Sequence, residues 1–163
     1  MPIIEILNGA PVWAYALLVV LIALGVRRLK ARDVPVFVAI IPVAAFFVWS
    51  VFGAVSFAAI GGGFFAAAAW TGGAAIGAAS AKLLPDARGV RLPGGRVHLP
   101  KSWIPLLLYM FVFVVRFACG AWAAINPAQA VLATGIGVAV SAAVTARLAM
   151  SVRFWVPLEM PAS

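Results

Sequence analysis

Acidic residues are scarce in this chain. Only four of its 163 residues are Asp or Glu, and charged residues make up 10%, whereas soluble globular proteins average about 25%. The single histidine, His98, and the single cysteine, Cys119, lie in different regions. One cysteine excludes a disulfide within the chain, and a metal or haem site needs further donor residues. Because no acid–base pair is visible either, we expect a protein that is not an enzyme and binds no cofactor or metal.

Apolar residues dominate instead, at 66% of the chain, with a mean hydropathy of +1.14. A run of about 20 apolar residues is long enough to cross the hydrocarbon core of a membrane. The sequence therefore predicts an all-α polytopic membrane bundle that forms one integral membrane domain over residues 1–163. Merging the second and third runs around Ser56 would leave four spans, but Ser56 and the neighbouring glycines favour a turn there. Five transmembrane helices are expected, at residues 11–26, 35–55, 57–81, 103–125 and 128–150.

Basic residues mark alternate gaps between these runs. Short loops rich in Lys and Arg stay in the cytoplasm, so the N-terminus is expected outside and the C-terminus inside. A net charge of +8 does not predict nucleic-acid binding, because the basic residues flank membrane spans and do not share one polar face. Anionic lipids at the basic loops are the expected partners, at about 1 kcal/mol for each basic residue. These residues are Arg27, Arg28, Lys30 and Arg32, then Lys82, Arg88, Arg91, Arg96 and Lys101, and finally Arg147 and Arg153.

The third gap, residues 82–102, is the only sizeable water-facing segment that the sequence predicts. Residues 90–99 alternate in polarity around Pro93-Gly94-Gly95, which is typical of a β-hairpin. Such a hairpin is either a solvated cytoplasmic loop or a surface for anionic lipid.

Trp49, like other aromatic residues near the predicted outer ends, is expected in an interfacial aromatic belt.

Small residues recur every four positions in two of the predicted spans. Gly73 and Gly77 follow this spacing in residues 57–81, and Gly137 begins a similar series in residues 128–150. Such spacing lets helix backbones approach closely. These positions are therefore candidate helix-packing sites, open to a membrane partner or to a second copy of the chain.

Arg116 is the one basic residue in the middle of a predicted span. It lies about 14 Å from the outer end of its helix, at a rise of about 1.5 Å per residue, where an arginine costs about 2.5–3.5 kcal/mol to insert. Its helical neighbours include Tyr109, Val112 and Cys119. The opposite face of the helix carries bulkier apolar residues, so Arg116 is expected to point into the bundle. That opposite face comprises Leu107, Phe111, Val114, Ala118, Ala121 and Ile125.

No acid falls within a predicted span, so Arg116 has no carboxylate partner at its depth. The acids are Glu5, Asp33, Asp86 and Glu159. A candidate intramembrane polar site instead combines Arg116 with Trp70, Thr134 and Ser141. Two interpretations stay open. Either these groups and trapped water satisfy a structural arginine, or Arg116 is a positive centre that attracts an anionic substrate or lipid.

Four segments of the chain carry a resemblance to known proteins. They are Pro11-Val12-Trp13, Arg27-Arg28-Leu29-Lys30, Leu99-Pro100-Lys101-Ser102-Trp103-Ile104-Pro105-Leu106 and Phe113-Val114-Val115-Arg116-Phe117. These segments resemble those of a family of small, uncharacterised multi-pass proteins of the bacterial inner membrane. The entry to the fourth predicted span is the most specific, although Lys101 stands where that pattern is expected to have glycine. The resemblance implies the inner membrane and a helical bundle, and it implies no activity.

Two classes of function are consistent with the sequence. In the first, the chain is a non-catalytic accessory or interaction protein of the bacterial inner membrane that docks a partner or dimerises through its small-residue faces. In the second, it is a small permease or an anion- or lipid-binding membrane protein centred on Arg116. The sequence favours the first class.

Overall fold

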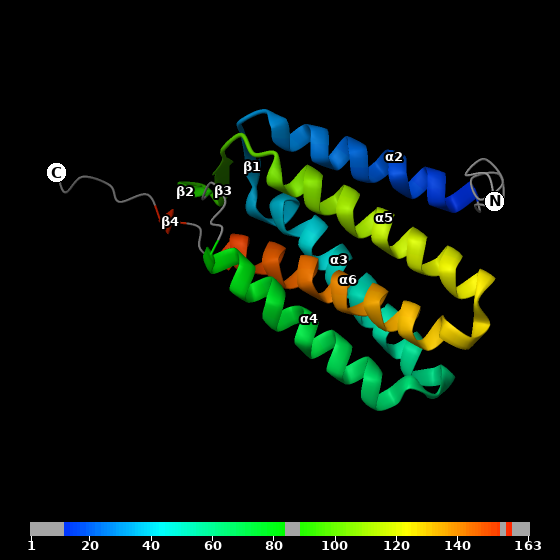
Figure 1. The fold of residues 1–163 in the computed structure, drawn as a ribbon. Coiled ribbons are helices and arrows are strands. Elements are labelled where there is room, and N and C mark those ends of the chain that lie inside the picture. Colours follow the sequence, from blue (N-terminus) through cyan, green and yellow to red (C-terminus); the bar gives the residue numbers. More distant parts are fainter. Residues whose placement is uncertain (1–11, 84–88, 154–155, 158–163) are drawn as a thin grey trace.

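Five α-helices make up most of the structure, a computed structural model that describes residues 12–83, 89–153 and 156–157. The helices pack side by side with a small β-sheet at one end (Figure 1). Their apolar composition suits a bundle in which most outward side chains face lipid. The helices are α2 (Val12–Val26), α3 (Val36–Phe57), α4 (Gly63–Leu83), α5 (Ile104–Ile125) and α6 (Ala130–Arg153).

Helix α6 is the centre of the bundle. It packs against α3, α4 and α5, while α2 packs mainly against α5 (Figure 1). The main core cluster joins α2, α5 and α6 through Leu21, Tyr109, Val112, Val144 and Leu148, all of which are buried. Half of the apolar window of α6 is buried, far more than in any other membrane-length helix of the described residues. The last helix in the sequence thus organises the others.

Four of the described helices are long and apolar enough to cross a membrane, as expected for four of the five predicted spans. They are α3, α4, α5 and a last segment that joins the 3-10 turn η3 (Pro127–Gln129) to α6. Helix α2 has 15 residues, fewer than the roughly 20 that a straight span needs. The predicted first span began at Pro11, which lies outside the described residues.

The connection between α3 and α4 matches the predicted turn in part. Gly53 and Ser56 were expected to help break the chain, but both lie within α3. The chain reverses at a π-helical turn, η2 (Ala58–Gly62), which contains Gly61 and Gly62 of the glycine cluster that was also expected there. Pro42 is accommodated inside α3, as membrane helices allow when neighbouring helices cover the freed carbonyl.

The predicted hairpin is confirmed and belongs to a larger sheet. Strands β2 (Val90–Leu92) and β3 (Arg96–Leu99) pair antiparallel, and Gly94 and Gly95 adopt φ values of 77° and 70° in the turn. Only glycine takes such values without strain. Two further strands, β1 (Arg32–Pro35) and β4 (Val156–Pro157), complete a sheet of order β1-β3-β2-β4. The sheet therefore extends beyond residues 82–102 and includes strands from two other parts of the chain.

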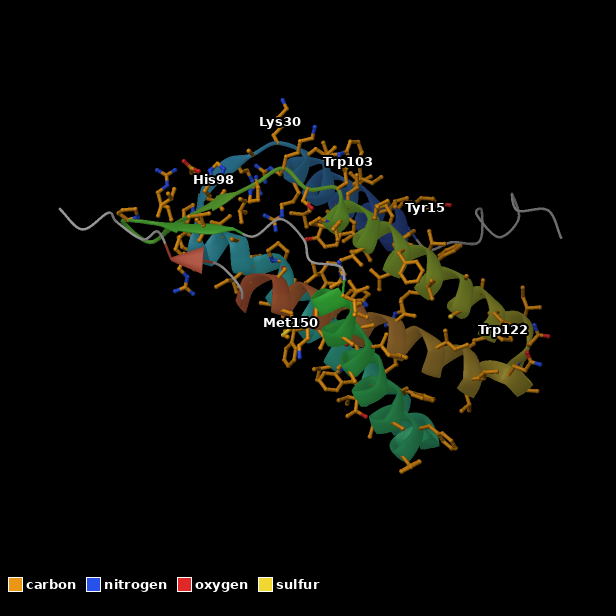
Figure 2. The ribbon with its side chains drawn as sticks, turned by 60° about the vertical axis from the view of Figure 1, so that its left-hand side comes forward. Tyr15, Lys30, His98, Trp103, Trp122 and Met150 are labelled. Carbon is orange, nitrogen blue, oxygen red and sulfur yellow. The ribbon has the colours of Figure 1, made fainter. Side chains whose placement is uncertain are left out.

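The sheet brings the basic gaps of the sequence to one end of the bundle. Strand β1 lies in the first gap, the hairpin occupies the third, and β4 follows α6. Figure 2 shows Lys30 and His98 at this end and Trp122 at the other.

Arg147 had been assigned to the closing gap, yet it lies inside α6. Only 9% of its surface is exposed, and its Nη1 atom donates a hydrogen bond to Ser80 Oγ at 3.1 Å. Its partner on α4 explains why a guanidinium is tolerated there.

Candidate functional site

Helix α5 turns its small and polar face inward, as its sequence predicts. Tyr109, Val112 and Cys119, which share a face with Arg116, are buried. Leu107 and Phe111, on the opposite face, are 64% and 55% exposed. Because a helix repeats every 3.6 residues, this rotation points Arg116 into the bundle and away from lipid.

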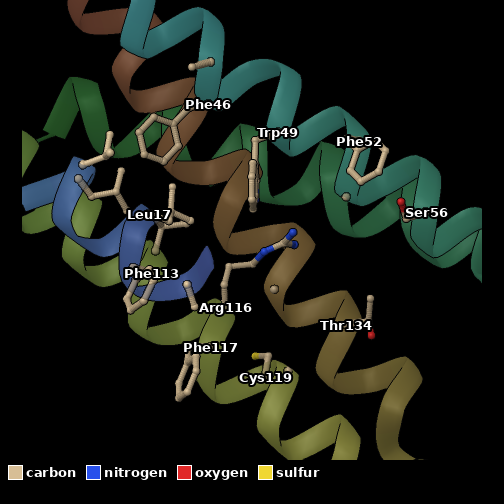
Figure 3. Close-up of a pocket in the computed structure, with 18 of the residues that line it drawn as sticks. Leu17, Phe46, Trp49, Phe52, Ser56, Phe113, Arg116, Phe117, Cys119 and Thr134 are labelled. Atoms are coloured by element: carbon tan, nitrogen blue, oxygen red, sulfur yellow. The ribbon is translucent and has the colours of Figure 1, made fainter. Parts of the chain in front are cut away.

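The Arg116 side chain enters an apolar pocket of about 810 Å³. The pocket is enclosed by α2, α3 and α5, with three residues of α6 completing the wall (Figure 3). Its size falls within the range of about 300–1,000 Å³ that is usual for ligand sites. Among the described residues that line the pocket, Arg116 is the only one with a charged side chain. Leu17, Leu21, Phe46, Trp49, Phe113 and Phe117 form much of the apolar wall.

Two glycines leave room for the Arg116 side chain. A methyl group on Gly53 of α3 would lie 3.0 Å from Nη2 and 3.1 Å from Nη1. A methyl group on Gly137 of α6 would lie 3.3 Å from Cδ of the same arginine. Gly137, predicted as a helix-packing residue, therefore borders the stem of Arg116, and Gly53 borders its charged end. Any larger residue at Gly53 would crowd the guanidinium group.

The charge of Arg116 is not neutralised by any residue that the structure describes. No hydrogen bond or ion pair joins its guanidinium group to another described residue, and the one described acid, Asp33, pairs with His98 in the sheet. The other three acids, Glu5, Asp86 and Glu159, lie outside the described residues. An arginine placed among apolar side chains normally pairs with an anion or with backbone carbonyls. Within the described chain, the guanidinium group faces the pocket.

Only one of the three groups expected beside Arg116 lines the same pocket. Thr134, on α6, does so. Ser141 donates to the carbonyl of Gly137 in its own helix at 2.8 Å, and Trp70 donates from Nε1 to Ser50 Oγ at 3.0 Å. Ser50 was not predicted as a partner. Two features of the sequence could have indicated this pair. The indole N–H of Trp70, within an apolar run, needs an acceptor, and Ser50 lies within the preceding apolar run.

Trp49, which was expected in an aromatic belt, lines the pocket. It lines the same cavity as Arg116, and both side chains point into it (Figure 3). Trp49 and Arg116 lie at similar distances from the ends of α3 and α5. Trp49, Gly53 and Ser56 were not predicted as site residues, because their assignment requires the rotation of α3 about its axis.

We infer that the pocket opens between α2 and α3, the two of its walls that are not joined by close helix packing. These two helices share no extensive contact, since α2 packs on α5 and α3 packs on α6. Pocket-lining side chains on both sides of the gap are exposed: Val20 of α2 by 52%, and Trp49 and Phe52 of α3 by 45% and 71%. If these helices cross a membrane, the opening faces lipid tails and not water. Such an entrance suits a ligand that is already dissolved in the bilayer.

The small-residue faces of α4 and α6 pack against each other within one chain. A methyl group on Gly73 would lie 2.1 Å from the carbonyl oxygen of Ala139, and one on Gly77 would lie 2.0 Å from that of Ala143. Only glycine permits this approach of two backbones. Gly73 and Gly77 are therefore occupied by α6, and this face is closed to a partner or a second copy.

Comparisons with models of known protein families, with curated proteins and with solved structures find no match for this chain. The resemblance carried by residues 99–106 and by the surroundings of Arg116 accordingly stays a prediction.

Proposed function

We propose that this chain is a membrane protein that binds an anionic amphiphile inside the bilayer, with Arg116 as the cation that holds the ligand's charged group. The guanidinium group lies in an apolar pocket of about 810 Å³ without a partner among the described residues, and this observation carries the proposal. Desolvating a cation without an anion is costly. In the unliganded protein this free-energy cost is not offset. Binding of an anion next to Arg116 offsets it and so favours the complex.

The chemistry of the wall defines the ligand class. Apolar side chains from α2, α3 and α5 surround the guanidinium group, and the hydroxyl groups of Ser56 and Thr134 are the main other polar groups. A small, fully hydrated anion would lose its water without gaining apolar contacts. A carboxylate or phosphate joined to a hydrocarbon chain fits better, because its head pairs with Arg116 while its chain covers Leu17, Phe46 and Phe113.

The same packing argues for the binding function over the accessory function. Docking of a partner was expected at the faces that carry Gly73 and Gly77, and α6 of the same chain covers them. The sideways opening between α2 and α3 offers a route from lipid to Arg116. A lipid-binding or lipid-transporting role uses both features, whereas an accessory role uses neither.

The proposed setting is the bacterial inner membrane, with five spans, the N-terminus outside and the C-terminus inside. The gathering of the sheet and its basic residues at one end of the bundle supports this orientation, since the positive end of a membrane protein faces the cytoplasm. In this arrangement Arg116 lies about 14 Å below the outer end of α5. The pocket then draws its ligand from the outer half of the bilayer.

Native mass spectrometry of the protein extracted gently from its own membrane tests the proposal. We expect the wild type to retain an anionic amphiphile at a ratio of one per chain, and Arg116→Met to lose it by about tenfold or more. Arg116→Lys, which keeps the charge but loses the bidentate geometry, is expected to retain part of it. Equal retention by the wild type and Arg116→Met, with both variants folded, would overturn the proposal.

A further inference from the structure

A second basic site lies outside the pocket, at the sheet end of the bundle. Three arginines come from the short connection between α2 and α3: Arg27 and Arg28 in the 3-10 turn η1 (Arg27–Leu29), and Arg32 in β1. The carbonyl of Arg28 accepts a hydrogen bond from Ser102 N at 3.0 Å, which fixes η1 beside the start of α5. The three guanidinium groups are therefore carried by an ordered backbone.

Arg32 carries a donor that has no partner within the described chain. Its Nε atom is buried and has no hydrogen-bond partner among the described residues. Burial lowers the pKa of Arg32 from its ordinary value, and the positive charges of Arg27 and Arg28 lower it further. A buried donor without an acceptor is costly, and adjacent like charges add to that cost. An anion held among the three arginines offsets the repulsion between their charges.

The nearest described acid does not fill this role. Asp33 follows Arg32 in β1, and successive side chains of a strand point to opposite faces of a sheet. Its Oδ1 atom lies 2.6 Å from Nδ1 of His98, its register partner on β3. Asp33 is thus held on the other face, by a different group.

We infer that Arg27, Arg28 and Arg32 form a binding site for a phosphate group at the sheet end of the bundle. Guanidinium groups match phosphate oxygens in planar, bidentate geometry. Because the cluster joins two membrane-embedded helices, the phosphodiester of a phospholipid on the basic side of the membrane is within reach of it. Free inorganic phosphate has the same chemistry, and the experiment below separates the two sources. This inference does not rest on the pocket around Arg116.

The test uses the full-length protein carrying Arg116→Met, so that the pocket does not contribute to binding. The delipidated protein in neutral detergent is titrated with phosphatidylglycerol, and the singly bound complex is counted by native mass spectrometry. Arg32→Gln is expected to weaken binding about tenfold. The matched control is Lys30→Gln, which removes the same charge from the same connection; Figure 2 shows Lys30 pointing away from the fold. Its exposed charge is screened, so a loss of about twofold or less is expected.

Equal losses in the two variants would overturn the site, because they would show attraction by net charge alone. Arg27→Gln and Arg28→Gln provide the same comparison if Arg32→Gln fails to fold. Unchanged binding in all three arginine variants would also overturn it. A parallel titration with inorganic phosphate identifies the source: displacement of the lipid at millimolar phosphate supports a site for the free anion, and persistence of the complex supports a lipid headgroup.

Discussion

Gly53 of α3 lies directly against the guanidinium group of Arg116 on α5, where a methyl group would be 3.0 Å from Nη2. We expect Gly53→Val to displace the guanidinium group and weaken retention of an anionic amphiphile by about tenfold, because the added atoms fill the space that the charged end occupies. Native mass spectrometry of the purified variant measures the retained ligand.

Gly120 provides the matched control for this change. It lines the same pocket on α5, but a methyl group there meets nothing within 4 Å. Gly120→Ala is therefore expected to change retention by about twofold or less. A loss as large as that of Gly53→Val would mean that the pocket as a whole, and not the position of Arg116, controls binding.

The stability of Arg116→Met separates a binding residue from a structural one. Methionine fills similar space without charge, so its insertion avoids the cost of about 2.5–3.5 kcal/mol for a central arginine. We expect the free energy of unfolding in detergent, followed by circular dichroism, to rise by about 1–3 kcal/mol. A decrease of similar size would show that Arg116 holds the bundle together through a partner.

The contact between α4 and α6 requires glycine at Gly73. A methyl group there would lie 2.1 Å from a backbone oxygen of Ala139, so the helices must separate in Gly73→Ala, at a cost of about 1–3 kcal/mol. Unfolding in detergent measures this cost. Gly72→Ala is the control: a methyl group at Gly72 meets nothing within 4 Å, and better helix propensity is expected to leave stability unchanged or raise it by about 0.5–1 kcal/mol. Equal effects would contradict the packing described.

The two ends of the bundle are expected on opposite sides of the membrane. Ala31, beside β1, and Asn126, between α5 and η3, are both exposed. In a chain carrying Cys119→Ala, we expect a membrane-impermeant maleimide added to intact cells to label Asn126→Cys and not Ala31→Cys. The reverse pattern would contradict the proposed orientation.

Local sequence patterns were enough to predict the helices and the hairpin. The apolar runs specify α3, α5 and α6 within a few residues, whereas α4 begins at Gly63 and not at the predicted Phe57. The two glycines at 94 and 95 specify the turn of the hairpin. Strand β1 was missed because its pairing with β3 joins residues more than 60 positions apart, as in Asp33 with His98. Short strands have little periodicity of their own.

The candidate site was predicted only in part, for a geometric reason. The inward face of α5, and with it the direction of Arg116, follows from one helix alone. Which residues of other helices meet Arg116 depends on how those helices are rotated and tilted, and sequence spacing does not fix that. Gly53 and Trp49 were therefore missed, while Trp70 was expected at the site and bonds to Ser50 instead.

Quenching of Trp49 fluorescence tests the central proposal most directly, because this side chain lines the pocket beside Arg116. A brominated long-chain carboxylic acid is added to the protein in neutral liposomes, and the signal of Trp49 is taken as the difference between the wild type and Trp49→Phe. We predict that the quenching of Trp49 saturates with the acid and is lost in Arg116→Met. Quenching that rises without saturation and is the same in both proteins would contradict a binding site at Arg116.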